Sequence, residues 1–97
     1  MLLILRVLRQ SPLHGYAIAQ KIRTLSSDEL SVEEGSLYPA LQKLLANGWV
    51  KGEWTTSETG RKVRSYRLTS KGLKQLETEQ DDYQRTADAI AAIIEST

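Results

Sequence analysis

The chain has 97 residues, which fits one domain with little interior of its own, and a formal net charge of +1 from 13 basic and 12 acidic side chains. With no Cys and a single His, the composition excludes a disulfide framework and disfavours structural zinc, and we expect neither a metal nor another cofactor. The longest apolar runs, residues 1–5 and 89–94, fall far short of the about 20 residues of a membrane helix, so no membrane partner is expected.

Two helices are predicted at the start of the chain. Residues 2–8 are apolar on nearly every face, which is typical of a short buried helix, and Pro12 disfavours its continuation. Residues 16–25 carry apolar side chains at helical spacing, which predicts an amphipathic helix. The apolar positions of this second helix are Ile18, Ala19, Ile22 and Leu25.

A third helix is predicted next. Ser31 and Glu34 have the spacing of a capping box, but a helix that starts there would hold Pro39 in its interior. We therefore expect a start near residues 35–36, and an end at the Asn-Gly pair of residues 47–48. The apolar face of this helix consists of Leu37, Ala40, Leu41, Leu44 and Leu45.

A β-hairpin with a long loop is expected after the third helix. Residues 49–55 and 63–68 are rich in β-branched and aromatic side chains and flank a polar segment that contains one Gly. Trp49 and Trp54 are expected to pack in the core, and the alternative is an aromatic shelf for a ligand at a dimer interface. Strand alternation places Arg64 on the inward face but near the tip, where we expect it to extend into solvent.

The last predicted element is a helix that runs from an N-cap at Thr69 almost to the C-terminus. Its apolar residues recur at alternating steps of three and four, interrupted by Gln80, which is the pattern of a coiled-coil seam. The helix either packs on its own domain or pairs with a second copy. We favour the second interpretation, because the preceding elements already offer one another their apolar faces. The expected dimerisation residues are Leu73, Leu76, Tyr83, Ala87, Ile90 and Ile94.

Three helices followed by a hairpin is the order of a winged helix-turn-helix. The predicted fold class is mainly α with a small β-hairpin (α+β), with a DNA-binding domain over residues 1–68 and a dimerisation helix over 69–97. The third helix is the candidate recognition helix, and the wing is basic; the alternative is that both are ordinary solvated surface. The residues expected to contact double-stranded DNA are Ser36, Tyr38, Pro39, Gln42 and Lys43 on the helix and Arg61, Lys62 and Arg64 on the wing.

The near-neutral total charge argues against nucleic-acid binding until it is divided along the chain. Residues 1–74 carry 12 Lys or Arg and six Asp or Glu, whereas residues 75–97 carry one Arg and six acidic residues, which gives net charges of +6 and −5. DNA responds to the local field within a Debye length of about 8–10 Å. We therefore expect the basic part to face DNA and the acidic helix to point away from it.

Four segments together resemble the PadR family of transcriptional regulators: residues 14–16 (His-Gly-Tyr), 34–41, 48–50 and 66–72. The resemblance implies a homodimeric, usually repressing, DNA-binding protein whose single long C-terminal helix mediates dimerisation. It implies that Tyr16 contacts a backbone phosphate. It also places Ser36, Tyr38 and Pro39 at the major groove and Gly60, Arg61 and Lys62 at the wing tip.

The resemblance further implies a small aromatic or amphipathic effector that releases the DNA, as in many relatives. Drug-binding relatives place a Trp in the long helix, whereas this chain has Tyr83 there. Three rival functions remain beside this prediction: an enzyme built on His14, a winged-helix module for protein contacts without DNA, and another winged-helix family such as a MarR-like one. We predict a cytoplasmic homodimer that binds a two-fold DNA operator and has no catalytic residues.

Overall fold

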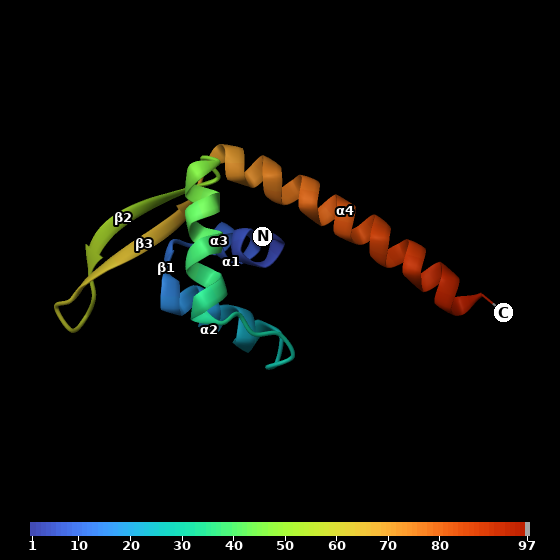
Figure 1. Ribbon diagram of the computed structural model, residues 1–97, viewed down its shortest axis with the longest axis horizontal. Helices are drawn as coiled ribbons and strands as arrows, with labels where there is room; N and C mark the ends of the chain where they lie inside the picture. Colours follow the sequence, from blue (N-terminus) through green and yellow to red (C-terminus); the bar gives the residue numbers. More distant parts are fainter. Residues whose placement is uncertain (97) are drawn as a thin grey trace.

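The computed structural model describes residues 1–96, so Thr97, the last residue of the predicted dimerisation helix, lies outside the described part. The elements in chain order are α1 (Leu2–Gln10), β1 (Leu13–His14), α2 (Gly15–Leu25), α3 (Glu34–Ala46), β2 (Val50–Thr56), β3 (Lys62–Leu68) and α4 (Ser70–Glu95). The α+β fold class is confirmed: helices and a small antiparallel sheet form a winged helix, and a long helix follows. The hairpin and α4 extend on opposite sides of α3 (Figure 1).

A single apolar core holds the winged helix together. The inner faces of α1, α2 and α3 meet in it, as their helical spacing predicts, together with one side chain each from β2, β3 and α4. The predicted inward face of α3 is confirmed, since its three core leucines are at most 1% exposed. The core residues are Ile4, Leu5, Val7, Leu8, Ile18, Ile22, Leu37, Leu41, Leu44, Val50, Tyr66 and Leu76.

The sheet contains a strand that was not predicted. Its order is β1-β3-β2, and β1 pairs antiparallel with β3 in the register Leu13 opposite Tyr66 and His14 opposite Ser65. A strand of two residues has no alternation that a sequence can display, so only the tertiary pairing reveals it. The predicted hairpin is confirmed, with β2 and β3 paired from Val50 opposite Leu68 to Thr56 opposite Lys62.

The start of α3 differs from the prediction by one or two residues. The helix begins at Glu34, one residue before the predicted range, after Glu33 as N-cap, and no side chain caps it, so the Ser31 capping box does not form. Pro39 is therefore inside the helix and leaves the carbonyl of Gly35 without a donor. Gly35 is exposed, so water can satisfy this carbonyl.

The end of α3 and the start of α4 meet at one junction. Gly48 has φ +72°, and the Trp49 N–H donates to the Leu44 carbonyl at 3.0 Å, which is the predicted glycine C-cap. Thr69 is the predicted N-cap of α4: its Oγ1 accepts from the Gly72 N–H at 3.0 Å and donates to the Gly48 carbonyl at 2.7 Å. The junction ties the direction of α4 to the winged helix.

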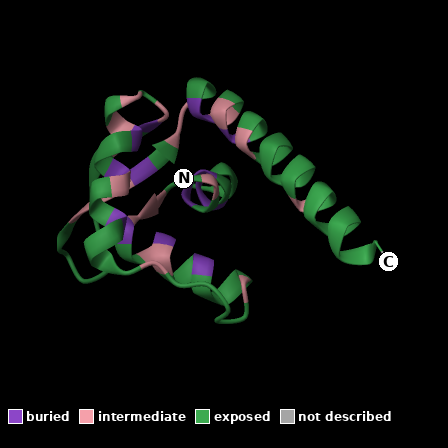
Figure 2. Cartoon of the chain, turned by 45° about the vertical axis from the view of Figure 1, so that its right-hand side comes forward, coloured by how far each residue is buried: buried purple, intermediate pink, exposed green. Residues whose placement is uncertain are grey.

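The first two turns of α4 pack on their own chain, and the rest of the helix is largely exposed (Figure 2). Leu76 is 0% exposed and Leu73 is partly buried against the core. Leu76 thus belongs to the interior of its own chain, and its prediction as a dimerisation residue is wrong. The heptad pattern could not show this, because the same face of α4 first meets α1 and only then leaves the domain. The predicted domain boundary after Leu68 does not follow the packing either, because Leu73 and Leu76 of α4 pack against the core of the winged helix.

Candidate nucleic-acid interface

The outward face of α3 is exposed along its whole length. The predicted contact residues on this face all lie opposite the buried leucines. The ring of Tyr38 also lies against the start of α2, where a Cβ built on Gly15 would be 3.6 Å from its Cε1 atom. The exposed residues are Ser36, Tyr38, Pro39, Gln42 and Lys43. The helix therefore presents one polar face that carries a hydroxyl, a phenol, an amide and an ammonium group.

The wing tip is an ordered turn that presents two cations. The Ser57 N–H donates to the Arg61 carbonyl at 2.8 Å, and the Arg61 N–H donates to Ser57 Oγ at 3.2 Å. Gly60 adopts φ +82°, a conformation that favours glycine, and closes the turn. Arg61 and Lys62 are exposed immediately after it. Their charges are free to meet a polyanion.

Arg64 and Trp54 do not lie where the sequence predicts. Trp54 is 68% exposed, so the prediction that it packs in the core is wrong. Trp49 is half-buried against the core, as expected. Trp54 shares the face of the buried Val50, but it lies toward the hairpin tip. Arg64 is not extended into solvent: it is half-buried, with its Cζ atom 6.0 Å from the Trp54 ring centroid and 5.9 Å from that of Tyr66.

A hollow of about 880 Å³ brings part of the predicted site together between the starts of α2 and α3 and the hairpin. Three of its lining residues are cations and one, Glu34, is a carboxylate, so the hollow is positively charged on balance. Trp54 and Glu34 are two of the lining residues that were not predicted as DNA contacts. The alternation of β2 could have placed Trp54 beside Arg64. The predicted DNA-contact residues that line the hollow are Tyr16, Tyr38, Arg61, Lys62 and Arg64.

The other predicted residues of α3 lie outside this hollow. Ser36, Pro39, Gln42 and Lys43 line none of the described cavities and belong to the exposed face of α3. The site is thus an exposed helix face with a cationic hollow at its N-terminal end. In this arrangement the side chains of α3 can form hydrogen bonds with base edges, and the hollow can bind backbone phosphates.

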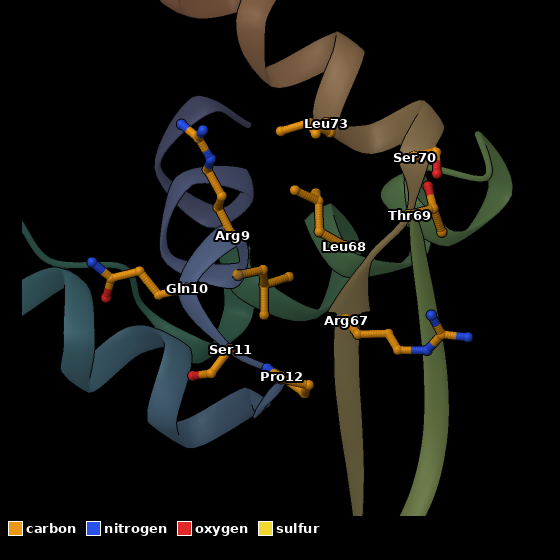
Figure 3. Close-up of a pocket in the computed structure, with 10 residues that line it drawn as sticks. Arg9, Gln10, Ser11, Pro12, Arg67, Leu68, Thr69, Ser70 and Leu73 are labelled. Carbon is orange, nitrogen blue, oxygen red and sulfur yellow. The ribbon is translucent and has the colours of Figure 1, made fainter.

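A second hollow of about 510 Å³ lies between the end of α1 and the junction of β3 with α4 (Figure 3). Leu68 and Leu73 point toward it, whereas Arg67 points away across β2, where its Nε donates to Glu53 Oε1 at 3.0 Å. This hollow contains none of the predicted DNA-contact residues. Its lining combines apolar side chains, Leu8, Pro12, Leu68 and Leu73, with polar ones that include Arg9.

Two absences hold for residues 1–96. No helix in this part of the chain combines the length and the apolar character needed to cross a membrane. The same residues contain no cluster of three His, Cys, Asp or Glu side chains that could hold a metal ion.

The chain is similar to one protein family and to several proteins of known structure. The model of the Transcriptional regulator PadR-like family matches residues 4–78. A solved transcriptional regulator from Clostridium thermocellum is 26% identical, with a TM-score of 0.88, and the match covers 97% of this chain and 91% of that chain. A PadR-like transcriptional regulator from Bacillus cereus is also 26% identical, with a TM-score of 0.82 and coverage of 97% and 89%.

A curated protein of Lysinibacillus sphaericus, described as uncharacterized, is 29% identical over 70 residues. The match covers 72% of this chain and 64% of that protein, so the chain spans less than two thirds of this relative's length. The solved regulators, in contrast, match nearly the whole chain, including the long C-terminal helix.

Proposed function

We propose that this chain, which belongs to the PadR-like family of transcriptional regulators, represses transcription as a homodimer bound to a two-fold operator in double-stranded DNA. One observation carries the proposal: the exposed polar face of α3 adjoins the cationic hollow, which residues of the wing also line. The hairpin that forms this wing extends away from α4 (Figure 1). Its relatives are transcriptional regulators, a class that is generally not enzymatic.

The proposed docking places α3 in the major groove, which is about 12 Å wide and admits one helix. Ser36 and Gln42 then face base edges as hydrogen-bond partners, and Lys43 faces a phosphate. The wing tip lies beside the backbone or the minor groove, where Arg61 and Lys62 neutralise phosphates. Tyr16, in the first turn of α2, donates a hydrogen bond from its phenol O–H to a phosphate oxygen.

Two uncovered apolar surfaces support the dimer. Beyond its second turn, α4 exposes Tyr83, Ile90, Ile93 and Ile94, although large apolar side chains usually find cover. A third hollow, of about 220 Å³ and lined mainly by apolar side chains, opens between α1, α2 and the loop after α2. A second copy would cover both surfaces at once, because each copy brings a helix and a hollow. The two recognition helices would then face half-sites about 10 bp apart.

The experiment that tests this function is selection of bound duplexes from a random DNA pool at a stated salt concentration. We expect enrichment of an inverted repeat with half-sites one helical turn apart, and transcription from a promoter that contains it should fall when the protein is present. A pool without enrichment would contradict DNA binding and favour a winged-helix module for protein contacts. Enrichment of a single half-site would contradict the two-fold dimer.

Lys62→Ala and Gln42→Ala should affect binding in different ways. Lys62 is an exposed cation at the wing tip, so its removal should weaken binding to all sequences and reduce the slope of log K against log salt by about 0.9 for each phosphate that it neutralises. Gln42 lies on the exposed face of α3, so its removal should relax sequence preference at one position of each half-site. Titrations of operator and scrambled duplex at several salt concentrations measure both effects. An unchanged salt slope in Lys62→Ala would remove this residue from the interface.

A small aromatic effector that releases the DNA completes the proposal. The hollow beside α4 in Figure 3 supports it, because apolar and polar side chains line it together and its volume of about 510 Å³ falls in the range of small-molecule sites. Addition of an aromatic candidate should release labelled operator over the same concentration range in which equilibrium dialysis shows that it binds the protein. Binding without release would contradict the effector role.

A further inference from the structure

One face of the hairpin holds the guanidinium of Arg64 in a seat formed by Gly52, Trp54 and Tyr66. Trp54 pairs with Arg64 across the two strands, and Gly52 pairs with Tyr66. Because side chains alternate along a strand, all four residues share one face. The guanidinium of Arg64 lies over Gly52, with its Cζ atom 6.0 Å from the Trp54 ring centroid and 5.9 Å from that of Tyr66. Two aromatic faces and a glycine therefore surround one cation.

Gly52 is what makes room for this arrangement. A Cβ atom built on Gly52 would lie 2.5 Å from Nε and 2.8 Å from Nη2 of Arg64. Any other residue at this position must therefore displace the guanidinium. The displaced group is the far end of a flexible side chain, and Gly52 is not in the left-handed region, so the strand itself accepts an alanine.

The charge of the seated arginine is not neutralised within the chain. Among residues 1–96, no carboxylate forms an ion pair with Arg64, and its Nε is enclosed without a hydrogen-bond partner. Arg67, on the opposite face of the same strand, is in contrast paired with Glu53. Arg64 lines the cationic hollow together with Tyr16, Tyr38, Arg61, Lys62 and the carboxylate of Glu34.

We infer that Gly52 and Trp54 are positioning residues that hold the Arg64 guanidinium ready for one DNA backbone phosphate at this hollow. The inference rests on the proposed function and adds to it how the contact is made. A free arginine side chain loses much rotamer freedom when it binds a phosphate, whereas a seated guanidinium has already lost that freedom on folding. The two rings and Gly52 therefore make Arg64 a stronger phosphate ligand than an equally charged residue whose side chain is free in solvent.

A double-mutant cycle between Gly52→Ala and Arg64→Gln tests the inference. Gly52→Ala should lower operator affinity about tenfold in the chain that keeps Arg64, but less than about twofold in the Arg64→Gln chain, because its effect acts only through the arginine. The salt slope of Gly52→Ala should fall by about 1.8, as in Arg64→Gln, since each half of the dimer then neutralises one phosphate fewer. Lys51→Gln is the matched control: it removes one cation from the opposite face of β2 and should leave the slope nearly unchanged.

A measurement without DNA separates this inference from the proposed function. Gly52→Ala should change the fluorescence emission of Trp54, obtained as the difference between chains with and without Trp54→Phe, because the cation leaves the ring. Unchanged Trp54 emission would overturn the seat. An equal loss of affinity in both arginine backgrounds, or no loss in either, would overturn the positioning role while leaving DNA binding intact. A wild-type chain that binds no duplex would overturn the proposed function and the phosphate contact with it.

Discussion

Ile90→Asp is expected to convert the dimer into a monomer and to lower operator affinity by about a hundredfold or more. Ile90 is 51% exposed on the outer part of α4, so the substitution leaves the core of each chain intact. In the proposed dimer the new carboxylate would be buried without a partner in the apolar seam. A monomer lacks the avidity of two linked half-site interactions, which amounts to a factor of about 10²–10⁴.

Light scattering of the protein as it elutes from a size-exclusion column measures the oligomeric state, and operator titrations measure the affinity. Ala92→Asp is the matched control: it adds the same charge to the same exposed stretch of α4, on the side opposite the predicted seam. This control should remain dimeric and bind the operator as the wild type does. A dimeric Ile90→Asp protein would contradict the seam, and a monomeric protein with unchanged operator affinity would contradict the need for dimerisation in DNA binding.

Patterns that repeat along the chain predicted most of the architecture. The spacing of Leu37, Leu41 and Leu44 fixes which side of α3 is buried, and the exposed face follows from it. The Thr69 cap and the Gly48 turn were equally visible, because each is a local rule that one or two residue types satisfy. Arg61 and Lys62 are exposed because the end of a hairpin has few neighbours that could bury them.

The errors share a cause, which is packing between elements far apart in the sequence. Leu76 follows the heptad pattern perfectly, and only the contact of α4 with α1 assigns it to its own chain. Trp54 is as apolar as a core residue, but it lies toward the tip of the hairpin, where it is 68% exposed. The burial of Arg64 depends on the absence of a side chain at Gly52 across the strand, which no pattern within β3 can reveal.

Gly72 is the position where local propensity and tertiary packing disagree most. It lies in the first turn of α4, where alanine is favoured over glycine by up to about 1 kcal/mol in a helix. A Cβ built on Gly72 would nevertheless lie 1.9 Å from the Trp49 carbonyl oxygen and 2.9 Å from its carbonyl carbon. These are backbone atoms held at the junction by the hydrogen bond from the Thr69 N–H to the Trp49 carbonyl at 3.1 Å, so they cannot move away as a side chain would.

We therefore expect Gly72→Ala to lower the free energy of unfolding by about 2–4 kcal/mol, because α4 must shift from the domain and loses its Thr69 cap. Urea denaturation at matched protein concentration measures this change, since dimer stability depends on concentration. Gly35→Ala is the control: Gly35 is an exposed glycine in α3, where a Cβ meets nothing within 4 Å, and the variant should be no less stable than the wild type. A Gly72→Ala protein of unchanged or higher stability would mean that helix propensity outweighs the junction. The direction of α4, and with it the spacing of the two recognition helices, would then not be fixed by this contact.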